Sequence, residues 1–392
     1  MTSTRTCRMY RLIALAALLL SAPKLFASQQ YSSSYGYSVD FPEGFYLEAK
    51  NDEGTAYQFA SAVLPVSAIL RVYENGRYPT AQEALDKTLD ALGADGASEC
   101  FDWRNSEAAV ATFTISLNGK KCQGAGVASQ LAFDAGTIVL FTWCEETKAD
   151  QCWNYMLSLL DSLCIDRGSY FEAGPITAYA YPPSEEDTEC TLTIDGKTFT
   201  TSMNASDREA SEYLIEREFD VMCLYQTSVL WKEAWQRYYR MIFRDSYQRT
   251  KQAAFDIYNA ISPDCADETD LAQKLLTWTQ GMSYEREKTV SDFASIPSIL
   301  QGGGSDCDSR SMLLFVLLRQ MNVDSLMFVS AEYSHAIAGI VSSHPGHSYT
   351  VSGKQYLMGE TTATGLTWGK VAQDQDDESK WIPIEPPLLY GQ

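Results

Sequence analysis

The chain has 392 residues, of which 45% are apolar and 21% charged, a balance that excludes a disordered chain and is typical of a globular protein. Its length predicts two domains, or three. Acidic residues outnumber basic ones by 51 to 30, which gives a net charge of −21. A surface this acidic repels phosphate backbones and anionic lipid, so the composition argues against nucleic acid and membrane surfaces as partners.

The first 27 residues have the layout of a secretory signal peptide. Three arginines precede the apolar run 12–22, and Ala27 offers a small residue for cleavage before Ser28. The run is too short to span a bilayer, which needs about 20 apolar residues, and no cysteine follows it closely as a lipid acceptor. We therefore expect an exported protein, periplasmic or extracellular, without an integral membrane span. Losing four basic and no acidic residues would lower its net charge to −25.

Nine cysteines follow this segment, from Cys100 to Cys307. An exported protein is expected to form disulfides, and an odd number leaves at least one thiol unpaired or paired between chains. Cys144 and Cys152 are the nearest pair along the chain, but spacing does not fix the connectivity. A thiol-based redox function has little support, since no Cys-x-x-Cys motif occurs.

Residues 28–165 are predicted to form an α/β module. Alternating apolar and polar residues, broken by Gly, Pro and Asn-Gly, predict strands over 35–46, 56–72, 108–117, 122–133 and 137–144. Apolar residues at helical spacing predict helices over 80–92 and 151–165. The phrase Tyr-Ser-Val-Asp-Phe-Pro-Glu-Gly-Phe, residues 37–45, together with these helices resembles the PsbP-type α/β sandwich. Such modules mostly bind partners or act as scaffolds.

Residues 166–200 are mixed in Pro, Gly, Glu and Ser, which predicts a linker with a short hairpin turning at Asp195. A helical pattern begins after Ser206 or Asp207 and continues to residue 261, and a shorter helix is predicted over 267–284. Tyr and Trp are frequent in the first of these helical stretches. A carbohydrate or peptide groove would use such aromatics, but helix-on-helix packing is the favoured interpretation.

The candidate nucleophile is Cys307. It follows three consecutive glycines in the segment 301–310, which reads Gln-Gly-Gly-Gly-Ser-Asp-Cys-Asp-Ser-Arg and leads into an apolar helix over 311–321. Ser305 or Asp306 would cap that helix and place the thiol in its first turn. Free N–H groups and the helix dipole stabilise an anion there, so we expect a lowered thiol pKa. The glycines let a substrate approach the backbone closely.

Two further residues complete a catalytic pattern. A predicted strand, 334–341, carries His335, and the next predicted strand, 355–362, carries Glu360. A helix followed by two strands can bring thiol, imidazole and carboxylate into line, with the carboxylate holding the tautomer of the ring. Thr361 and Glu332 are alternatives to the carboxylate of Glu360.

The Gly-rich loop, Cys-Asp, apolar helix, His-Ala strand and Glu-Thr-Thr strand together resemble the bacterial branch of the transglutaminase-like cysteine peptidase superfamily, over about residues 270–370. The resemblance implies a papain-like α+β core within a domain spanning 201–392. It implies Cys307 as nucleophile, His335 as base and Glu360 as orienting acid. Many members have an aromatic two residues after the histidine, and Asp as the acid, where this chain has Ile337 and Glu360.

Other residues near this pattern receive structural interpretations. The oxyanion donor stays open between the Cys307 N–H and the side chains of Gln301, Gln280 and Trp278. Asp308 and Arg310 are expected to fix the helix start. His344 and His347 lie in a Ser, Pro and Gly loop without a nearby carboxylate or paired cysteine, so a surface loop is favoured over a metal site.

The sequence thus predicts an α+β protein: a PsbP-like sandwich, a helical segment and a transglutaminase-like core. Its expected function is cysteine-dependent acyl transfer, as peptidase, amidase or cross-linking enzyme, on peptide or protein amides. No metal or cofactor is expected. The alternative is a non-catalytic transglutaminase-like module that binds a protein of the cell envelope.

Overall fold

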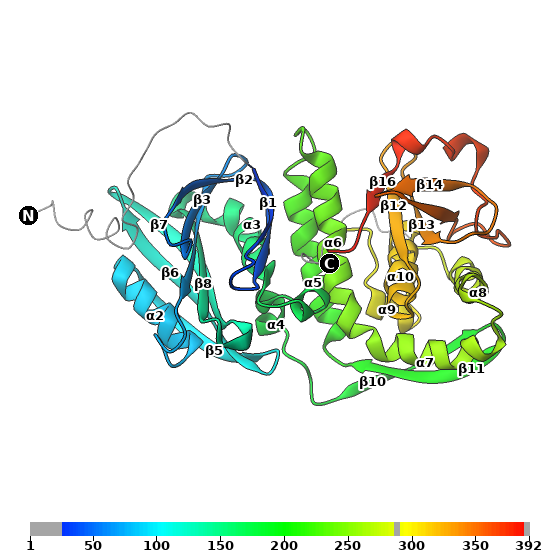
Figure 1. Ribbon diagram of the computed structural model, residues 1–392, viewed down its shortest axis with the longest axis horizontal. Helices are drawn as coiled ribbons and strands as arrows, with labels where there is room; N and C mark the ends of the chain where they lie inside the picture. Colours follow the sequence, from blue (N-terminus) through cyan, green and yellow to red (C-terminus); the bar gives the residue numbers. More distant parts are fainter. Residues whose placement is uncertain (1–25, 286–290, 388–392) are drawn as a thin grey trace, which may run out of the picture.

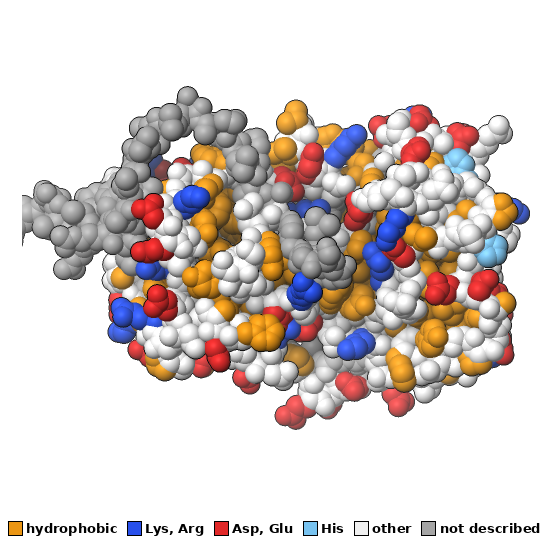
Figure 2. Space-filling model, in the orientation of Figure 1, with side chains coloured by type: hydrophobic (Ala, Val, Ile, Leu, Met, Phe, Trp, Pro, Cys, Tyr) orange, Lys and Arg blue, Asp and Glu red, His pale blue; other side chains and the backbone are white. Residues whose placement is uncertain are grey.

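The computed structural model describes residues 26–285 and 291–387 and shows an α+β protein with two large antiparallel sheets. One sheet lies in the N-terminal part, the other lies in the C-terminal part, and helices lie between them (Figure 1). The predicted α+β class is therefore confirmed. Acidic side chains are spread over both parts on the face drawn in Figure 2, as the net charge leads one to expect.

The N-terminal sheet has the strand order β1-β2-β3-β4-β8-β7-β6-β5, with β9 paired to β2. The bounds are β1 Phe26–Tyr31, β2 Ser38–Lys50, β3 Ala56–Ser61, β4 Val66–Tyr73, β5 Asp95–Trp103, β6 Ser106–Leu117, β7 Lys120–Gln130, β8 Thr137–Glu145 and β9 Leu163–Cys164. Each predicted strand segment is found, and the segment 56–72 is the hairpin of β3 and β4. β1, β5 and β9 were not predicted.

Two helices cover opposite faces of this sheet, α2 (Ala81–Leu92) and α3 (Ala149–Asp161). The Thr80 hydroxyl accepts the Glu83 N–H at the start of α2, and Gly93 ends the helix in the left-handed conformation. Both helices bury an apolar stripe, which produces one core on each side of the sheet. The two predicted helices are confirmed.

The predicted signal-peptide cleavage falls inside β1. Residues 1–25 lie outside the described residues, and β1 begins at Phe26. The register against β2 shifts between Ala27 and Gln29. Cleavage before Ser28 would remove the strand pairs that Phe26 and Ala27 form with β2 and keep those formed by residues 29–31.

The middle of the chain contains a hairpin and four helices. The bounds are α4 Pro175–Ala180, β10 Asp187–Ile194, β11 Lys197–Asn204, α5 Asp207–Cys223, α6 Trp231–Arg249, α7 Lys251–Ile261. Asp195 and Gly196 have φ of 51° and 74°, as in the type I′ turn of a two-residue hairpin, so the predicted turn is confirmed. β11 continues past residue 200, where the sequence places the end of the linker.

The helical stretch that the sequence predicts as continuous to residue 261 is in fact three helices. The first break follows α5, where Tyr225 donates a 2.7 Å hydrogen bond to the Glu43 carbonyl and Ser228 accepts one from the Leu230 N–H. Tyr225, Tyr238 and Tyr239 are buried, which agrees with packing rather than an exposed aromatic groove.

The C-terminal part packs a buried helix on a five-stranded sheet of order β14-β15-β13-β12-β16. The bounds are α8 Glu268–Gln280, α9 Ile296–Leu300, α10 Cys307–Gln320, β12 Ser325–Ser330, β13 His335–Val341, β14 Ser348–Val351, β15 Lys354–Gly359 and β16 Ile382–Ile384. Apolar side chains on every side of α10 are buried, because the sheet covers one side of it and α6 to α8 cover the others.

The nine cysteines from Cys100 to Cys307 are all free thiols in this structure, so the expected disulfides are not formed in it. Cys144 and Cys152, the pair nearest in sequence, are buried and hydrogen-bonded to each other. In the part of the chain that the structure describes, none of the helices has both the length and the hydropathy to cross a bilayer.

Candidate active site

Cys307 is the first residue of α10, as the sequence predicts. Asp306 caps the helix: its carboxylate accepts the Ser309 N–H at 2.9 Å, and the Ser309 hydroxyl accepts the Asp306 N–H at 2.9 Å. This reciprocal pair fixes the first turn of α10. The Cys307 side chain is buried, 4% exposed, beneath the end of the Gly-rich loop.

His335 and Glu360 form a hydrogen-bonded pair. His335 begins β13 and Glu360 follows the last residue of the neighbouring strand β15, so their side chains meet at one end of the sheet. The distance from His335 Nε2 to Glu360 Oε2 is 2.7 Å, and both side chains are largely buried. Because Nε2 is engaged by the carboxylate, Nδ1 is the ring nitrogen left to exchange a proton with a substrate or a thiol.

The structure also brings Cys307 to β13. The backbone N–H of Ala336, the residue after His335, hydrogen-bonds the Cys307 sulfur. The thiol itself donates to Asp308 Oδ1 at 3.2 Å. Within residues 26–285 and 291–387, no hydrogen bond joins the thiol to the imidazole. Cys307, His335 and Glu360 therefore converge where α10 meets the sheet, with the thiol turned to its neighbouring acid.

The expectation of a lowered pKa for Cys307 is wrong. Burial raises the pKa of this thiol, and the charges of Asp308 and Asp306 and the hydrogen bond to Asp308 raise it further. The Ala336 N–H opposes this rise and is the smallest of these effects. A helix N-terminus contributes only about 0.3–1 kcal/mol to an anion, so burial between two acids outweighs it.

The two acids also affect each other. Burial and the charge of Asp308 raise the pKa of Asp306 to about 6, although its bonds to Ser309 act in the opposite direction. Asp308 accepts a 2.5 Å hydrogen bond from the Tyr239 hydroxyl, which fixes the carboxylate beside the sulfur. The sequence showed both acids, but it did not show that their environment would be buried.

Glu360 is the acid that contacts His335, rather than the alternatives. Burial raises its pKa, but His335 and Thr362 more than offset this, so the net pKa of Glu360 is lowered and the group is ionised at neutral pH. Glu332 is exposed, and the Thr361 hydroxyl lies 3.4 Å from that of Ser311. Glu360 lies just beyond β15 rather than inside the predicted strand, since Gly359 ends that strand packed tightly against the Trp368 ring.

Gln280 positions Glu360 and is not free to stabilise an oxyanion. Its amide donates to the carbonyls of Glu360 at 2.9 Å and Leu366 at 3.0 Å, and its oxygen accepts the Gly365 N–H at 3.0 Å. Sequence reasoning considered Gln280 as an oxyanion donor and missed this role. The sequence signal that could have indicated this role is that Gln280 is a polar residue at the end of an otherwise apolar helix face in α8.

Arg310 connects the segments around the nucleophile. Its guanidinium donates to the hydroxyl of Ser305 and to the carbonyls of Met282 and Thr361, at 2.7–3.3 Å. These bonds tie α10 to the Gly-rich loop, the end of α8 and the segment after Glu360. Arg310 thus does more than fix the helix start.

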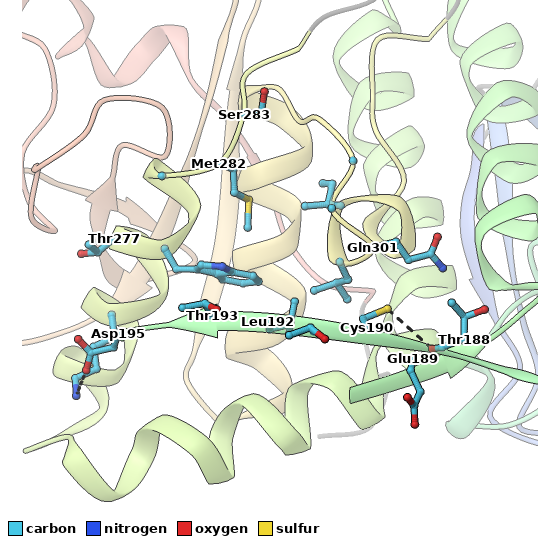
Figure 3. A pocket seen from close by; sticks show the side chains of 18 of the residues that line it. Thr188, Glu189, Cys190, Leu192, Thr193, Asp195, Thr277, Met282, Ser283 and Gln301 are labelled. Carbon is cyan, nitrogen blue, oxygen red and sulfur yellow. Dashed lines mark hydrogen bonds and ion pairs between the residues drawn. The ribbon is translucent and has the colours of Figure 1, made fainter. Parts of the chain in front are cut away.

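The start of α10 offers the Cys307 amide to an oxyanion. Asp306 accepts the N–H groups of Ser309 and Arg310 through its carboxylate and carbonyl. The N–H group of Cys307, in the first turn of the helix, is not used by this cap. Trp278 and Gln301, which the sequence also suggested, line a separate cavity beside β10 (Figure 3).

His335 has aromatic neighbours, and a cavity borders its partner Glu360. The Trp381 ring lies 6.3 Å from the imidazole and 5.4 Å from the Tyr333 ring, measured between centroids. A cavity of about 570 Å³ borders Glu360 and is also lined by His347 and Asp376. Small molecules in this cavity would reach Glu360 of the His335–Glu360 pair.

The loop histidines take part in separate contacts. His344 Nδ1 lies 3.1 Å from the Ser342 hydroxyl, and the His347 ring packs edge-on against Tyr349. Among the residues that the structure describes, no three His, Cys, Asp or Glu side chains are grouped as metal ligands.

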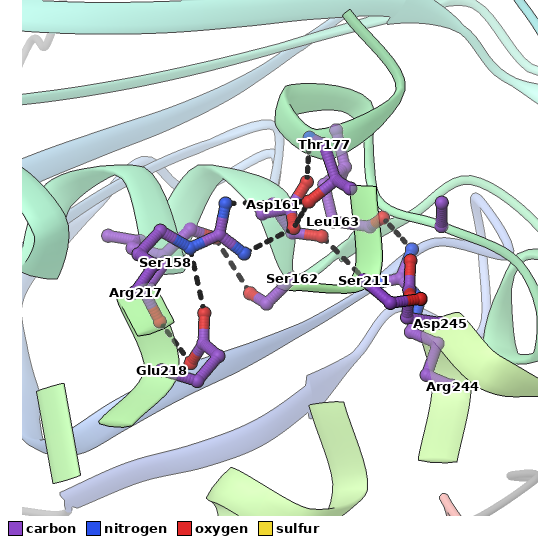
Figure 4. A network of polar contacts seen from close by, with 12 residues as sticks. Ser158, Asp161, Ser162, Leu163, Thr177, Ser211, Arg217, Glu218, Arg244 and Asp245 are labelled. Atoms are coloured by element: carbon purple, nitrogen blue, oxygen red, sulfur yellow. Dashed lines mark hydrogen bonds and ion pairs between the residues drawn. The ribbon is translucent and has the colours of Figure 1, made fainter. Parts of the chain in front are cut away.

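A second cluster of buried charge lies between helices α3 and α4 on one side and α5 and α6 on the other (Figure 4). Arg217 contacts Asp161 at 2.5 Å and Glu218 at 3.0 Å, and Arg237 contacts Glu218 at 2.8 Å. Arg244 donates to three backbone carbonyls of the N-terminal part. The cavity beside Glu218 and Arg237 holds about 10 Å³, so this cluster joins the two parts rather than binding a ligand.

No protein-family model and no curated protein sequence matches this chain. Part of it resembles solved structures. PsbP (CyanoP) from Synechocystis sp. PCC 6803 is 12% identical, with 39% of this chain and 99% of that one covered and a TM-score of 0.29. The Ran-binding protein Mog1p of Saccharomyces cerevisiae is 9% identical, with 36% and 96% covered and a TM-score of 0.27.

LpqN of Mycobacterium tuberculosis, which is involved in cell envelope biogenesis, is 12% identical, with 36% of this chain and 90% of that one covered and a TM-score of 0.25. The predicted PsbP-like resemblance is therefore found, as a distant likeness of part of the chain. Likenesses at these scores carry no argument about activity or partners.

Proposed function

We propose that this protein is an exported, cysteine-dependent acyl-transfer enzyme of the transglutaminase-like type, acting on peptide or side-chain amide bonds. The observation that carries the proposal is the 2.7 Å His335–Glu360 pair at the strand that also hydrogen-bonds the Cys307 sulfur. A nucleophile at a helix start, a base and an orienting acid are the parts that such chemistry needs.

The raised thiol pKa determines how the nucleophile would be activated. Cys307 rests as a neutral thiol, so rotation of its side chain away from Asp308 has to bring the proton to His335 Nδ1. The sulfur then attacks the carbonyl carbon as the S–H bond breaks, and the ionised Glu360 stabilises the imidazolium. The N–H group of Cys307 donates to the oxyanion.

Collapse of the tetrahedral intermediate breaks the C–N bond, and the leaving amine takes the proton from His335. The thioester on Cys307 is then attacked by water, deprotonated by the same imidazole, which gives a carboxylic acid and restores the thiol. An amine in place of water would give cross-linking. We favour hydrolysis, since water is always abundant. A cell-envelope peptide or protein is the proposed substrate, in the periplasm or outside the cell.

The test is acylation of the full chain by p-nitrophenyl acetate, followed by intact mass and peptide mapping. The proposal predicts one acetyl group on Cys307, formed roughly 100-fold or more faster than in His335→Ala, the usual contribution of a general base. Cys307→Ser is the matched control and should lose that label. Acetylation spread over the other thiols, or unchanged by His335→Ala, would contradict the proposal.

A non-catalytic binding module is the second candidate, and the buried, protonated thiol is the observation that favours it. In that case Cys307→Ser would leave the binding of a cell-envelope partner unchanged, and no acyl-enzyme would form. The acetylation experiment separates the two functions, because only the first requires a covalent intermediate.

A further inference from the structure

The hairpin strand β10 has an open edge that faces a cavity. The sheet formed by β10 and β11 has two strands, and among the described residues no third strand pairs with it. α7 packs along β11, while β10 runs beside a cavity of about 810 Å³ whose other walls come from α8, α9 and the Gly-rich loop (Figure 3). The residues 188–193 all line that cavity.

The register shows which backbone groups face outward. Ile194 and Lys197 close the two-residue turn, and such a closing pair is hydrogen-bonded in this hairpin type. Hydrogen-bonded pairs then alternate, so the N–H and C=O groups of Glu189, Thr191 and Thr193 point away from β11. The side chains of these three residues are exposed. β10 therefore presents a row of donors and acceptors to the cavity.

This edge lacks three of the features that usually prevent strand addition, namely a proline, a lysine and a bulge. β10 reads Asp-Thr-Glu-Cys-Thr-Leu-Thr-Ile, without a proline, a lysine or a bulge in its pairing to β11. Its Thr and Ile residues favour extended backbone. The opposite wall combines apolar side chains, such as Trp278, Met282 and Ile299, with polar ones such as Gln273, Thr277 and Gln301.

The two ends of the cavity differ in charge. At the turn, Asp195 and Lys274 form an ion pair of 2.8 Å. At the other end Glu189 joins no ion pair within the described part of the chain, and the neighbouring Glu186 and Asp187 are also exposed. This end is acidic, and it would attract a basic side chain.

We propose that β10 binds an extended polypeptide segment by strand addition, with a basic residue of the segment against Glu189 and uncharged side chains along the opposite wall, which is mostly uncharged. Main-chain hydrogen bonds to the open edge would supply affinity and the acidic end would set polarity. The cavity lies close to the nucleophile loop, because the Ser305 hydroxyl donates to the Ser283 carbonyl at 3.3 Å and Met282 also lines the cavity. Binding here does not require Cys307 to react.

The experiment measures fluorescence anisotropy of a labelled heptapeptide, Lys-Val-Thr-Val-Thr-Val-Gly, with the full chain carrying Cys307→Ser. We expect saturable binding. Two methylated peptides are compared, each N-methylated at every second amide, one at the odd and one at the even positions. The peptide whose methylated amides face β10 should bind at least tenfold more weakly. Glu189→Lys should weaken binding of this peptide at least tenfold. The same variant should strengthen binding of a second peptide in which Glu replaces the first Lys. Glu146→Lys, a matched charge reversal on the exposed surface of the N-terminal part, should change neither.

Hydrogen exchange supplies the second readout, since bound peptide should protect the amides of Glu189, Thr191 and Thr193. No saturable binding up to millimolar peptide, equal affinity for all methylated peptides, or no protection of these amides would overturn the proposal. If the peptide does not bind but Cys307 of the parent chain is still acetylated, the strand-addition site is overturned and the proposed catalysis is not. Peptide binding without acetylation would overturn only the proposed catalysis.

Discussion

Buried charge is arranged in opposite ways at the contact between the two parts of the molecule and around Cys307. At the contact the carboxylates of Asp161 and Glu218 meet the guanidinium groups of Arg217 and Arg237. Burial alone would raise the pKa of Asp161, but Arg217 and the hydrogen bonds from Thr177 lower it overall. Around the thiol, acids lie beside one another, and the pKa values of Asp306 and Cys307 both rise.

This difference indicates that the buried charges at the contact stabilise the structure, whereas those around Cys307 affect its chemistry. Opposite charges with complete hydrogen bonding hold two surfaces in one geometry, and neither group has a reason to exchange a proton. Like charges around a thiol keep its proton in place and make the group dependent on an external base. In the proposed mechanism that base is His335, which is hydrogen-bonded to the ionised Glu360.

The largest expected effect is on stability at the contact. Arg217→Met leaves the Asp161 carboxylate buried without its closest cation, so the free energy of unfolding should fall by about 3–5 kcal/mol in urea titrations followed by circular dichroism. Arg208→Met on the same helix removes an exposed pair with Glu212, at 2.9 Å, and should lose less than about 1 kcal/mol. Equal losses in the two variants would show that the buried pair is not stabilising.

Glu43 is an acid of the contact that behaves like the acids of the site. Burial and the charge of Asp40 raise its pKa to about 7, against 4.5 for the free group. Its contribution to stability is complete below pH 4.5 and is lost as the pH rises through 7. Glu43→Gln cannot ionise, so it should match the parent at pH 4.

At pH 8 the Glu43→Gln variant should be more stable than the parent by up to about 3 kcal/mol, from the cost of ionising the buried carboxyl. Thermal unfolding at the two pH values measures this. A variant less stable than the parent at pH 8 would mean that ionised Glu43 is stabilised by Arg240 and Arg237, as at the rest of the contact.

A smaller effect is expected on the thiol. Asp308→Asn removes the nearest negative charge but keeps an oxygen for the Tyr239 hydroxyl, so it should lower the pKa of Cys307. Alkylation by iodoacetamide at pH 8 should become faster, on the order of tenfold. Cys100, which is exposed, serves as the reference thiol within each sample. An unchanged or slower rate would remove Asp308 as a cause of the raised pKa.

Local sequence predicted the site best where local contacts decide the structure. Asp306 and the apolar run after it define the start of α10, and an antiparallel strand order brings His335 next to Glu360. The hairpin turn at Asp195 was also predictable, because Asp-Gly favours the positive φ values of a type I′ turn.

Tertiary contacts decided the rest. The break after α5 contains neither Gly nor Pro and depends on Tyr225 reaching Glu43 in a distant strand. β5 is an exposed edge strand with little apolar patterning. The thiol pKa was mispredicted because its largest cause, the burial of Cys307, comes from tertiary packing. The second cause is the charge of Asp308, whose carboxylate is held by Tyr239 of α6, far away in the sequence.

The central claim is that Cys307 is a neutral thiol activated by His335. The pH dependence of its acetylation, followed by stopped flow in the parent and in His335→Ala, tests this most directly. The account predicts that the parent rate rises through neutral pH and levels off, while the variant remains slow until alkaline pH forms the thiolate. Superimposable profiles in the two proteins would contradict it.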